Sequence, residues 1–151
     1  MSERQRAHQG HCRTATGDTL TAQDVYDIWK IRDAVFAFEQ HVEDTDPDGR
    51  DLLPTTTHMW LADHQGPTSY LRVLDDGHVH LGRVCTRQDQ RGLGLAGQLM
   101  AEATRLWGDR EIALNAQSHL ERWYESFGYM RSGEDFDEAG IQHTPMVRPA
   151  P

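Results

Sequence analysis

The stretch Val84–Met100, VCTRQDQRGLGLAGQLM, constrains the fold of this chain more than any other part of the sequence. An apolar run over 78–85 ends in polar residues, and Arg91, Gly92 and Gly94 then lead directly into a helical pattern. A strand, a glycine-rich turn and a helix start together leave a row of backbone N–H groups at the positive end of a helix, where an anionic phosphate is stabilised. The stretch therefore predicts a phosphate site.

Length and charge limit what can surround this site. A chain of 151 residues has the length of one domain, and we expect a flexible polar tail over 1–18 followed by the domain over 19–151. The net charge of -9 argues against nucleic acid or an acidic membrane as a partner, because those surfaces need dense Lys and Arg. Arg83, Arg87 and Arg91 nevertheless crowd beside the predicted phosphate site, which suits an anionic cofactor.

Cysteine usage and hydropathy indicate the compartment. The two cysteines, Cys12 and Cys85, are too few for a disulfide framework, and no window approaches the roughly 18 apolar residues of a membrane span. The N-terminal residues lack the apolar core of a secretory signal. We therefore expect a cytoplasmic protein that binds no membrane.

The first predicted element of the domain is a helix that begins at Thr21, whose hydroxyl can cap it together with Asp24. Apolar residues at helical spacing predict its buried side: Val25, Ile28, Trp29, Val35 and Phe36. The helical pattern fades after Phe38, where acidic residues, Pro and Gly take over.

The loop after this helix is rich in aspartate. Asp44, Asp46, Asp48 and Gly49 resemble the first positions of an EF-hand calcium loop, but the twelfth position holds Thr55 in place of a bidentate Glu. This argues against calcium. Two interpretations of the loop stay open: a solvated acidic turn, or a collar that attracts an amine substrate.

Three extended runs follow, over 58–62, 69–74 and 78–85, and turn residues separate them. They predict an antiparallel meander. His78 and His80 alternate with apolar residues, which favours the solvent-facing side of a strand over a metal site.

The second half of the chain predicts a helix over 95–107 and a strand over 111–116, parallel to the strand before that helix. A short helix capped by Ser118 with Glu121 and two strands over 129–147 complete the pattern. The order helix, meander, helix, strand, helix, hairpin indicates an α+β fold with one mixed sheet.

Two familiar phosphate motifs do not fit the glycine-rich turn. A Walker loop needs Gly-Lys before Ser or Thr, and Lys30 is the only lysine in the chain. A Rossmann turn belongs to a βαβ unit, whereas a meander precedes Gly92.

The chain instead resembles the GNAT superfamily of N-acetyltransferases over 21–148. Arg91, Gly94 and Ala96 match the family's acetyl-CoA signature, R/Q-x-x-G-x-G/A, and the segment 124–129, YESFGY, matches its later Y-x-x-x-G-F/Y pattern. Further segments resemble the ElaA group within this superfamily: RDAVFAFEQ, LRVL, GRV, AQSHL and GIQHTPM. The resemblance implies an α+β (α/β GNAT-like) fold whose mixed, mostly antiparallel central sheet has six to seven strands, flanking helices and a V-shaped opening between the fourth and fifth strands.

The resemblance also implies acetyl-CoA as co-substrate, an amine as acceptor and no metal. Backbone N–H groups of the turn would hold the pyrophosphate, and the pantetheine arm would pair with the end of a strand that is expected to carry a bulge. Gln117 stands where many family members carry Asn. The implied cofactor-binding residues are Val84, Cys85, Thr86, Arg91, Gly92, Leu93, Gly94, Leu95, Ala96 and Gln117.

For catalysis, the resemblance implies that Tyr124 is the general acid that protonates the departing thiolate. Three residues stay open as the base that takes the amine proton: Glu39, His119 and His143. Cys85 invites comparison with a cysteine nucleophile, but a strand cysteine is usually a small buried hydrophobe and the family transfers the acyl group directly.

The sequence therefore predicts an N-acetyltransferase that transfers an acetyl group from acetyl-CoA directly to a small amine or an exposed amino group. One alternative is a non-catalytic acyl-CoA-binding or sensing module. Another is an acyltransferase of the acyl-homoserine-lactone-synthase type, which the segment 32–36 resembles. A homodimer is expected by analogy with the superfamily alone.

Overall fold

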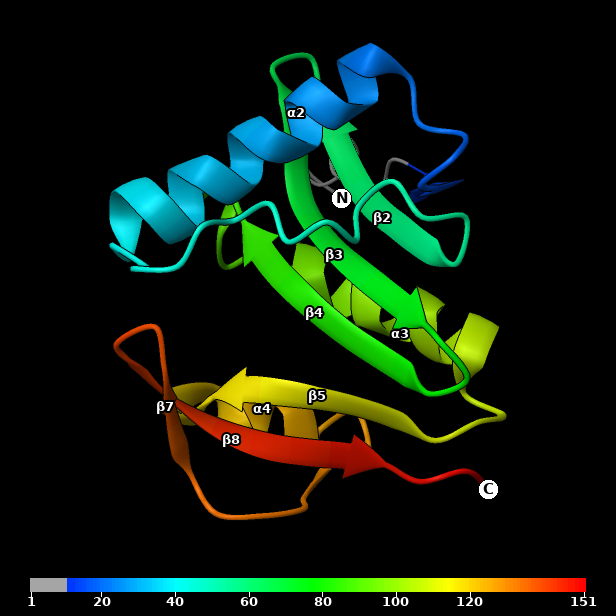
Figure 1. Cartoon of the computed structure of the whole chain (residues 1–151), viewed down its shortest axis with the longest axis vertical. Helices are drawn as coiled ribbons and strands as arrows, with labels where there is room; N and C mark the ends of the chain where they lie inside the picture. Colours follow the sequence, from blue (N-terminus) through cyan, green and yellow to red (C-terminus); the bar gives the residue numbers. More distant parts are fainter. Residues whose placement is uncertain (1–10) are drawn as a thin grey trace.

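One mixed β-sheet runs through the structure, a computed structural model that describes residues 11–151 (Figure 1). Its strands are β1 (Arg13–Thr16), β2 (Thr56–Asp63), β3 (Gly66–Asp75), β4 (Val79–Thr86), β5 (Ile112–Gln117), β6 (Met130–Arg131), β7 (Phe136–Glu138) and β8 (Ile141–Arg148). They follow the order β1-β2-β3-β4-β5-β8-β6, and β7 pairs with β8. The helical elements are α2 (Ala22–Arg32), the π-helix η1 (Asp33–Glu39), the 3₁₀ turns η2 (Gln88–Gln90) and η3 (Ser118–Leu120), α3 (Leu95–Trp107) and α4 (Glu121–Glu125).

The predicted opening lies between β4 and β5. These two strands are parallel, as predicted, and they pair only through Val79 with Ile112 and His80 with Ala113. Beyond these pairs the strands separate, which confirms the V-shaped opening (Figure 1). β4 also carries the expected bulge: its register against β3 shifts between Tyr70 and Arg72, and the backbone at Arg83 adopts a φ of 53°.

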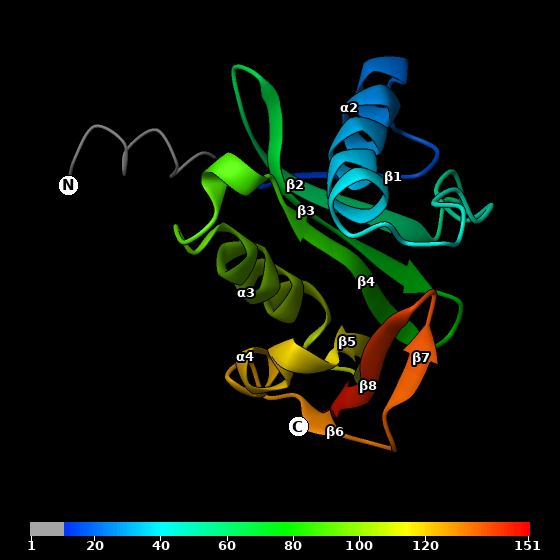
Figure 2. The ribbon, with the colours of Figure 1, turned by 90° about the vertical axis from the view of Figure 1, so that its left-hand side faces the viewer.

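Helices cover both faces of the sheet. Figure 2 shows α2 on one face and α3 with α4 on the other. Leu95, Leu99 and Ala103 recur every fourth residue on α3 and fill the core on its side of the sheet. A smaller apolar cluster lies under α2, where Ile28, Ile31 and Val35 pack against residues of β2, β3 and β4: Trp60, Tyr70 and Cys85.

The start of α2 follows the prediction, and its buried side follows it in part, because Ile28 and, in η1, Val35 are buried. The Thr21 hydroxyl accepts from the Asp24 N–H at 3.0 Å, and the Asp24 carboxylate accepts from the Thr21 N–H at 3.1 Å, so the capping box is formed. Val25 and Trp29 are exposed, at 38% and 55%. The buried stripe is centred on Ile28, and the next residue along a helix is turned about 100° away from it.

Three other predicted segments need correction. Within the expected flexible tail over 1–18, residues 13–16 form β1 and pair with β2, which continues the meander by one strand; residues 1–10 lie outside the described part. Ser118 does not cap α4, because the chain first makes the 3₁₀ turn η3 and the Ser118 hydroxyl accepts from Thr144 at 2.9 Å. The segment 129–147 contributes to three strands instead of two, so the described residues form eight strands.

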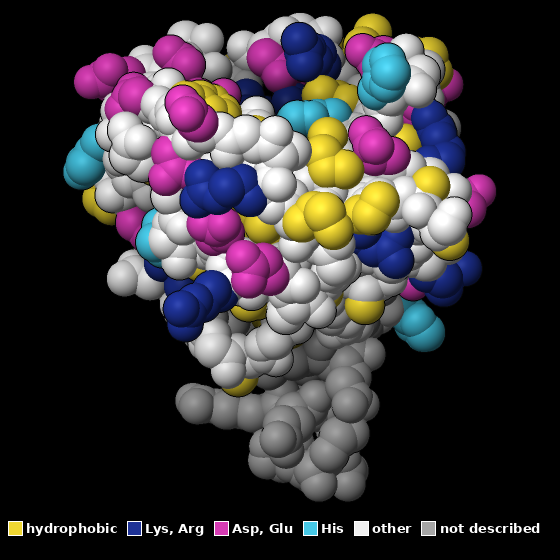
Figure 3. All heavy atoms as spheres, turned by 90° about the horizontal axis from the view of Figure 1, so that it is seen from below, with side chains coloured by type: hydrophobic (Ala, Val, Ile, Leu, Met, Phe, Trp, Pro, Cys, Tyr) yellow, Lys and Arg dark blue, Asp and Glu magenta, His cyan; other side chains and the backbone are white. Residues whose placement is uncertain are grey.

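The described residues 11–151 contain no helix that is long and apolar enough to cross a membrane. The face shown in Figure 3 carries acidic and basic side chains next to one another, without a continuous basic area.

Candidate active site

The glycine-rich turn and the start of α3 form an open site for an anion. Gly92 and Gly94 have φ values of 77° and 76°, in the left-handed region that favours glycine. A Cβ placed on either residue would meet no atom within 4 Å, so the space beside the turn is free. In contrast to α2, α3 begins with no side-chain cap, so its first backbone N–H groups are left for a ligand.

The three arginines near this turn do not form the free basic area that the sequence indicated. Arg87 pairs with Asp63 at 2.6 Å and with Asp89, and Arg83 lies 3.2 Å from an oxygen of Asp46. Both arginines are therefore already paired with carboxylates of this chain. The pairs with Asp63 and Asp46 join residues far apart in the sequence, so the local density of charge does not reveal them.

Arg91, at the start of the glycine-rich turn, pairs with Glu39 at the end of η1. Its Nη1 and Nη2 donate to the two carboxylate oxygens of Glu39 at 2.6 and 2.8 Å, and its Nε donates to the Thr86 carbonyl at 3.0 Å. The hydrogen bonds from Arg91 lower the pKa of Glu39. A carboxylate with a lowered pKa is a weaker proton acceptor, which favours a role in holding Arg91 over the predicted role as base.

A cavity of about 980 Å³ lies on the other side of the β4–β5 opening. It is lined by the end of α2 with η1, the acidic loop, β3, β4, β5, α4 and the β7–β8 hairpin. Among the predicted site residues, Val84, Gln117, Tyr124 and His143 line it. The other predicted residues are not part of its lining: Glu39, Cys85, Thr86, the turn residues 91–96 and His119.

Tyr124 lies in the cavity wall with its ring buried and 6% of the residue exposed. The rings of Trp123 and Tyr129 pack edge-on against it, with centroids 4.8 and 6.2 Å away. Burial raises the pKa of Tyr124, so the hydroxyl keeps its proton at neutral pH. Since no described residue hydrogen-bonds this hydroxyl, the proton is available to a ligand.

His143 is the one predicted base that lines the cavity. Its Nδ1 lies 2.8 Å from the Ile141 carbonyl, and because a carbonyl only accepts, Nδ1 carries the proton of the neutral ring. Nε2 is then the acceptor nitrogen. The ring stacks on Phe136 at 5.9 Å, and Glu138 lies 3.8 Å from Nε2. His119, in contrast, is exposed on η3.

Cys85 is buried beneath α2, and burial raises its pKa to about 12. A thiol with this pKa supplies almost no thiolate at neutral pH. The structure therefore gives no support to a cysteine nucleophile.

Gln117 makes a contact that the sequence did not indicate. Its Nε2 donates to Gln40 Oε1 at 2.9 Å, which links the end of β5 to the residue that follows η1. The neighbouring residue Glu39 holds Arg91, as described above. Two consecutive residues at the end of η1 thus contact the phosphate turn on one side and β5 on the other.

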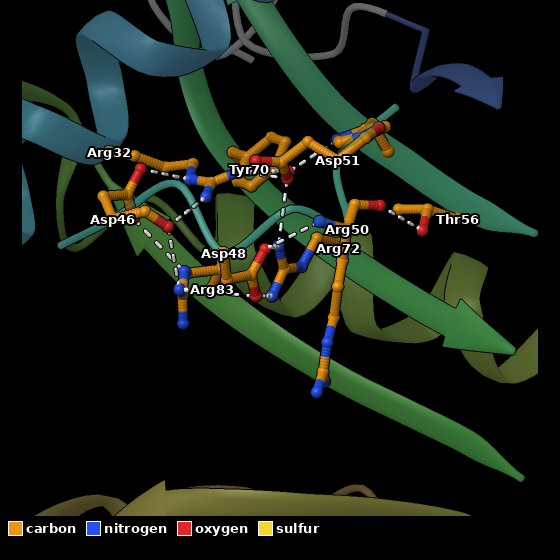
Figure 4. A network of polar contacts seen from close by, with 10 residues as sticks. Arg32, Asp46, Asp48, Arg50, Asp51, Thr56, Tyr70, Arg72 and Arg83 are labelled. Atoms are coloured by element: carbon orange, nitrogen blue, oxygen red, sulfur yellow. Dashed lines mark hydrogen bonds and ion pairs between the residues drawn. The ribbon is translucent and has the colours of Figure 1, made fainter. Parts of the chain in front are cut away.

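Three aspartates of the acidic loop, Asp46, Asp48 and Asp51, are paired with arginines, whereas no Lys or Arg of the described residues pairs with Asp44 (Figure 4). Arg32 reaches Asp46 at 2.8 Å and Asp51 at 2.6 Å, and Arg72 reaches Asp51 at 2.9 Å and Asp48 at 2.7 Å. Both arginines are buried. The loop is therefore tied down on the sheet by its own aspartates.

A buried histidine completes this network. His58 Nε2 lies 2.8 Å from the Asp51 carbonyl, and its Nδ1 lies 2.6 Å from the Tyr70 hydroxyl. Burial lowers the pKa of His58, so the ring is neutral: Nε2 donates to the carbonyl and Nδ1 accepts from Tyr70. The part of the chain that the structure describes holds no group of three or more His, Cys, Asp or Glu arranged for a metal ion.

Comparison with known proteins agrees with this architecture. The family model described as "Acetyltransferase (GNAT) domain" matches residues 18–149. Protein ElaA of Escherichia coli is 34% identical over 137 residues, covering 85% of this chain and 90% of that protein. The crystal structure of E. coli ElaA superposes with a TM-score of 0.84 over 91% of this chain and 98% of that chain.

Two further solved structures are informative. An acyl-CoA N-acyltransferase from Pseudomonas aeruginosa is 32% identical, with a TM-score of 0.84 over 92% of this chain and 99% of that chain. The acyl-homoserine-lactone synthase BjaI, solved with SAM and isopentyl-CoA, has a TM-score of 0.71 over 90% of this chain and 81% of that chain, but at 15% identity this likeness is one of fold alone. With the family model spanning nearly the whole described domain, the chain belongs to the GNAT acetyltransferase family and is homologous to ElaA.

Proposed function

We propose that this protein is an N-acetyltransferase that transfers an acetyl group from acetyl-CoA directly to an amine acceptor. The observation that carries the proposal is the gap between β4 and β5, with the open phosphate turn on one side and a Tyr124-lined cavity on the other. The GNAT family and its acyl-CoA N-acyltransferase member from P. aeruginosa support acyl transfer from a CoA thioester.

In this proposal the glycine-rich turn and the gap between β4 and β5 bind different parts of the cofactor. The backbone N–H groups of residues 91–96 would hold the pyrophosphate, and Arg91 would exchange Glu39 for a phosphate oxygen. The pantetheine arm would add to the free edge of β4 at Val84–Thr86, as a short extra strand does. Gln117, on the facing strand, would contact the same arm after releasing Gln40.

Acetyl-CoA supplies the acyl group as a thioester; this chain moves the protons. The neutral amine attacks the thioester carbonyl carbon, and the carbon–sulfur bond breaks. Tyr124 gives its hydroxyl proton to the departing sulfur, which its high pKa permits because the proton is still present at neutral pH. His143 Nε2 takes the proton that the amine loses, and the Ile141 carbonyl holds the ring in the required tautomer. Glu39 and His119, the other candidates, lie outside the cavity lining.

The proposal is tested by thiol release from acetyl-CoA with a panel of amines, using the wild-type chain and Tyr124→Phe. We expect Tyr124→Phe to lower kcat about 100-fold while CoA still binds, since only the donated proton is lost. Tyr26→Phe is the matched control, because Tyr26 is 57% exposed on α2 and lies outside the cavity. Unchanged turnover in Tyr124→Phe would remove the acid role. Tight CoA binding with no turnover of any amine would instead support a non-catalytic module.

A further inference from the structure

The charge network of Figure 4 carries one arginine more than it has aspartates to pair. Arg32, Arg72 and Arg83 make all their ion pairs with Asp46, Asp48 and Asp51. Arg50 belongs to the same loop, and its guanidinium has no partner among the described residues. The network therefore leaves one positive charge unpaired in a chain of net charge -9.

The backbone of Arg50 is fixed although its side chain is free. Its N–H donates to an Asp48 carboxylate oxygen at 3.1 Å, and its carbonyl accepts from the Thr56 hydroxyl at 2.6 Å. In Figure 4 the side chain extends from this anchored position away from the other residues of the network. Because the Arg50 backbone is already fixed, binding of a ligand by its guanidinium costs little further conformational entropy in the loop.

Another donor of the same network also lacks a partner. The Arg72 side chain is 5% exposed, and its two Nη atoms bind Asp48 and Asp51. Its Nε is buried and makes no hydrogen bond. A buried N–H without an acceptor is unfavourable, so the three aspartates leave the donors of the network short of acceptors even before Arg50 is counted.

Both arginines line the same cavity as Tyr124 and His143. Carboxylates that no Lys or Arg of the described chain pairs with line it as well: Asp33, Asp44, Asp76 and Glu138. The cavity thus offers negative charge for an ammonium group and, separately, the unpaired guanidinium of Arg50 for an anion.

On these grounds, and resting on the function proposed above, we propose that Arg50 binds a carboxylate of the acceptor. The acceptor is then a small molecule that carries both the amine to be acylated and a free carboxylate, such as an amino acid or a short peptide. Arg50 is a specificity-determining residue that contacts the acceptor away from the reacting atoms, and its guanidinium geometry suits a carboxylate in two-point contact.

The test compares diglycine and triglycine with their C-terminal amides, because each pair differs only in the carboxylate. Binding to the CoA-saturated protein is measured by calorimetry, and thiol release from acetyl-CoA is measured in parallel. We expect the wild-type chain to bind the acids at least about tenfold more tightly than the amides. Arg50→Gln should abolish this preference by weakening the acids alone, and Arg50→Lys should restore part of it.

Arg122→Gln is the control, since Arg122 is an exposed arginine outside the cavity whose side chain has no partner among the described residues. It should keep the wild-type preference. Equal binding of acids and amides by the wild-type chain, or equal weakening of both by Arg50→Gln, would overturn the carboxylate site. Loss of thiol release with every acceptor, while the binding preference persists, would overturn the proposed acetyl transfer and leave the carboxylate site standing.

Discussion

Arginine–carboxylate ion pairs occur at two places, in the network of Figure 4 and at the phosphate turn, and the pairs at the two places differ in burial. In the network of Figure 4, the Arg32 and Arg72 side chains are 2% and 5% exposed and the acidic loop is held against the sheet. At the phosphate turn, the Arg91 side chain is 39% exposed and Glu39 is 31% exposed. The same chemistry serves different ends: a buried pair that loses a partner leaves a desolvated charge, whereas an exposed pair can exchange its partner for a ligand.

Arg32→Ala tests the buried side of this comparison and should have the largest effect. It removes one of the two arginines that pair with Asp46 and with Asp51, and removing one member of a buried pair costs about 3 to 5 kcal/mol. Arg91→Ala should cost less than about 1 kcal/mol. Urea unfolding of both variants measures the free energies; similar losses would contradict the distinction between the two places.

The pH dependence of stability tests the buried network in a second way. Burial alone would raise the pKa of Asp48, but the hydrogen bonds and charge of Arg72 outweigh it and bring the pKa to about 2. Because the pKa in the folded state lies below the unfolded value of about 3.9, the stabilisation is present above about pH 4 and is lost as the pH falls toward 2.

We expect this loss to amount to about 2 kcal/mol, measured by urea unfolding between pH 5 and pH 2. The direction follows from proton uptake: the unfolded state binds the Asp48 proton at a higher pH than the folded state does, so acid favours unfolding. Asp48→Asn removes the titrating group and should flatten the pH dependence in this window. A slope as steep in Asp48→Asn as in the wild-type chain would mean that other carboxylates carry the effect.

The elements that the sequence predicted well depend on neighbouring residues. The capping box of Thr21 and Asp24 spans four positions, and the glycine-rich turn needs positive φ at Gly92 and Gly94, which local sequence can specify. The antiparallel meander and the parallel strand after α3 followed from turn residues and the crossover between the strands, and the opening of the sheet followed from the family resemblance.

The contacts that the sequence did not predict join distant residues. Arg32 meets Asp46 across 14 positions, Arg72 meets Asp48 across 24, and Arg91 meets Glu39 across 52. No periodicity links such positions. Local composition therefore suggested a basic area at the turn and left open a collar of free aspartates, whereas the folded chain pairs Asp46, Asp48 and Asp51 with arginines. The position of Tyr124 in the cavity wall was accessible through a motif, whereas Arg50 has no motif and only the pairing of its neighbours singles it out.

Glu39→Gln tests the exposed side of the comparison, and its expected effect is the smallest. The substitution removes the charge that holds Arg91 while keeping the shape of the side chain. An exposed ion pair is worth about 0.2 to 1 kcal/mol, so freeing Arg91 should tighten CoA binding by about two- to fivefold, measured by calorimetry.

The turnover of the same variant separates the two roles considered for Glu39. If Glu39 holds Arg91, kcat stays close to the wild-type value; if it were the base, kcat would fall about 100-fold and CoA binding would not change. Glu125→Gln is the matched control, because Glu125 is exposed on α4 and its side chain has no partner among the described residues. Since a base and a holding residue move different measurements, this single substitution decides whether the end of η1 belongs to the chemistry or to the entry of the cofactor.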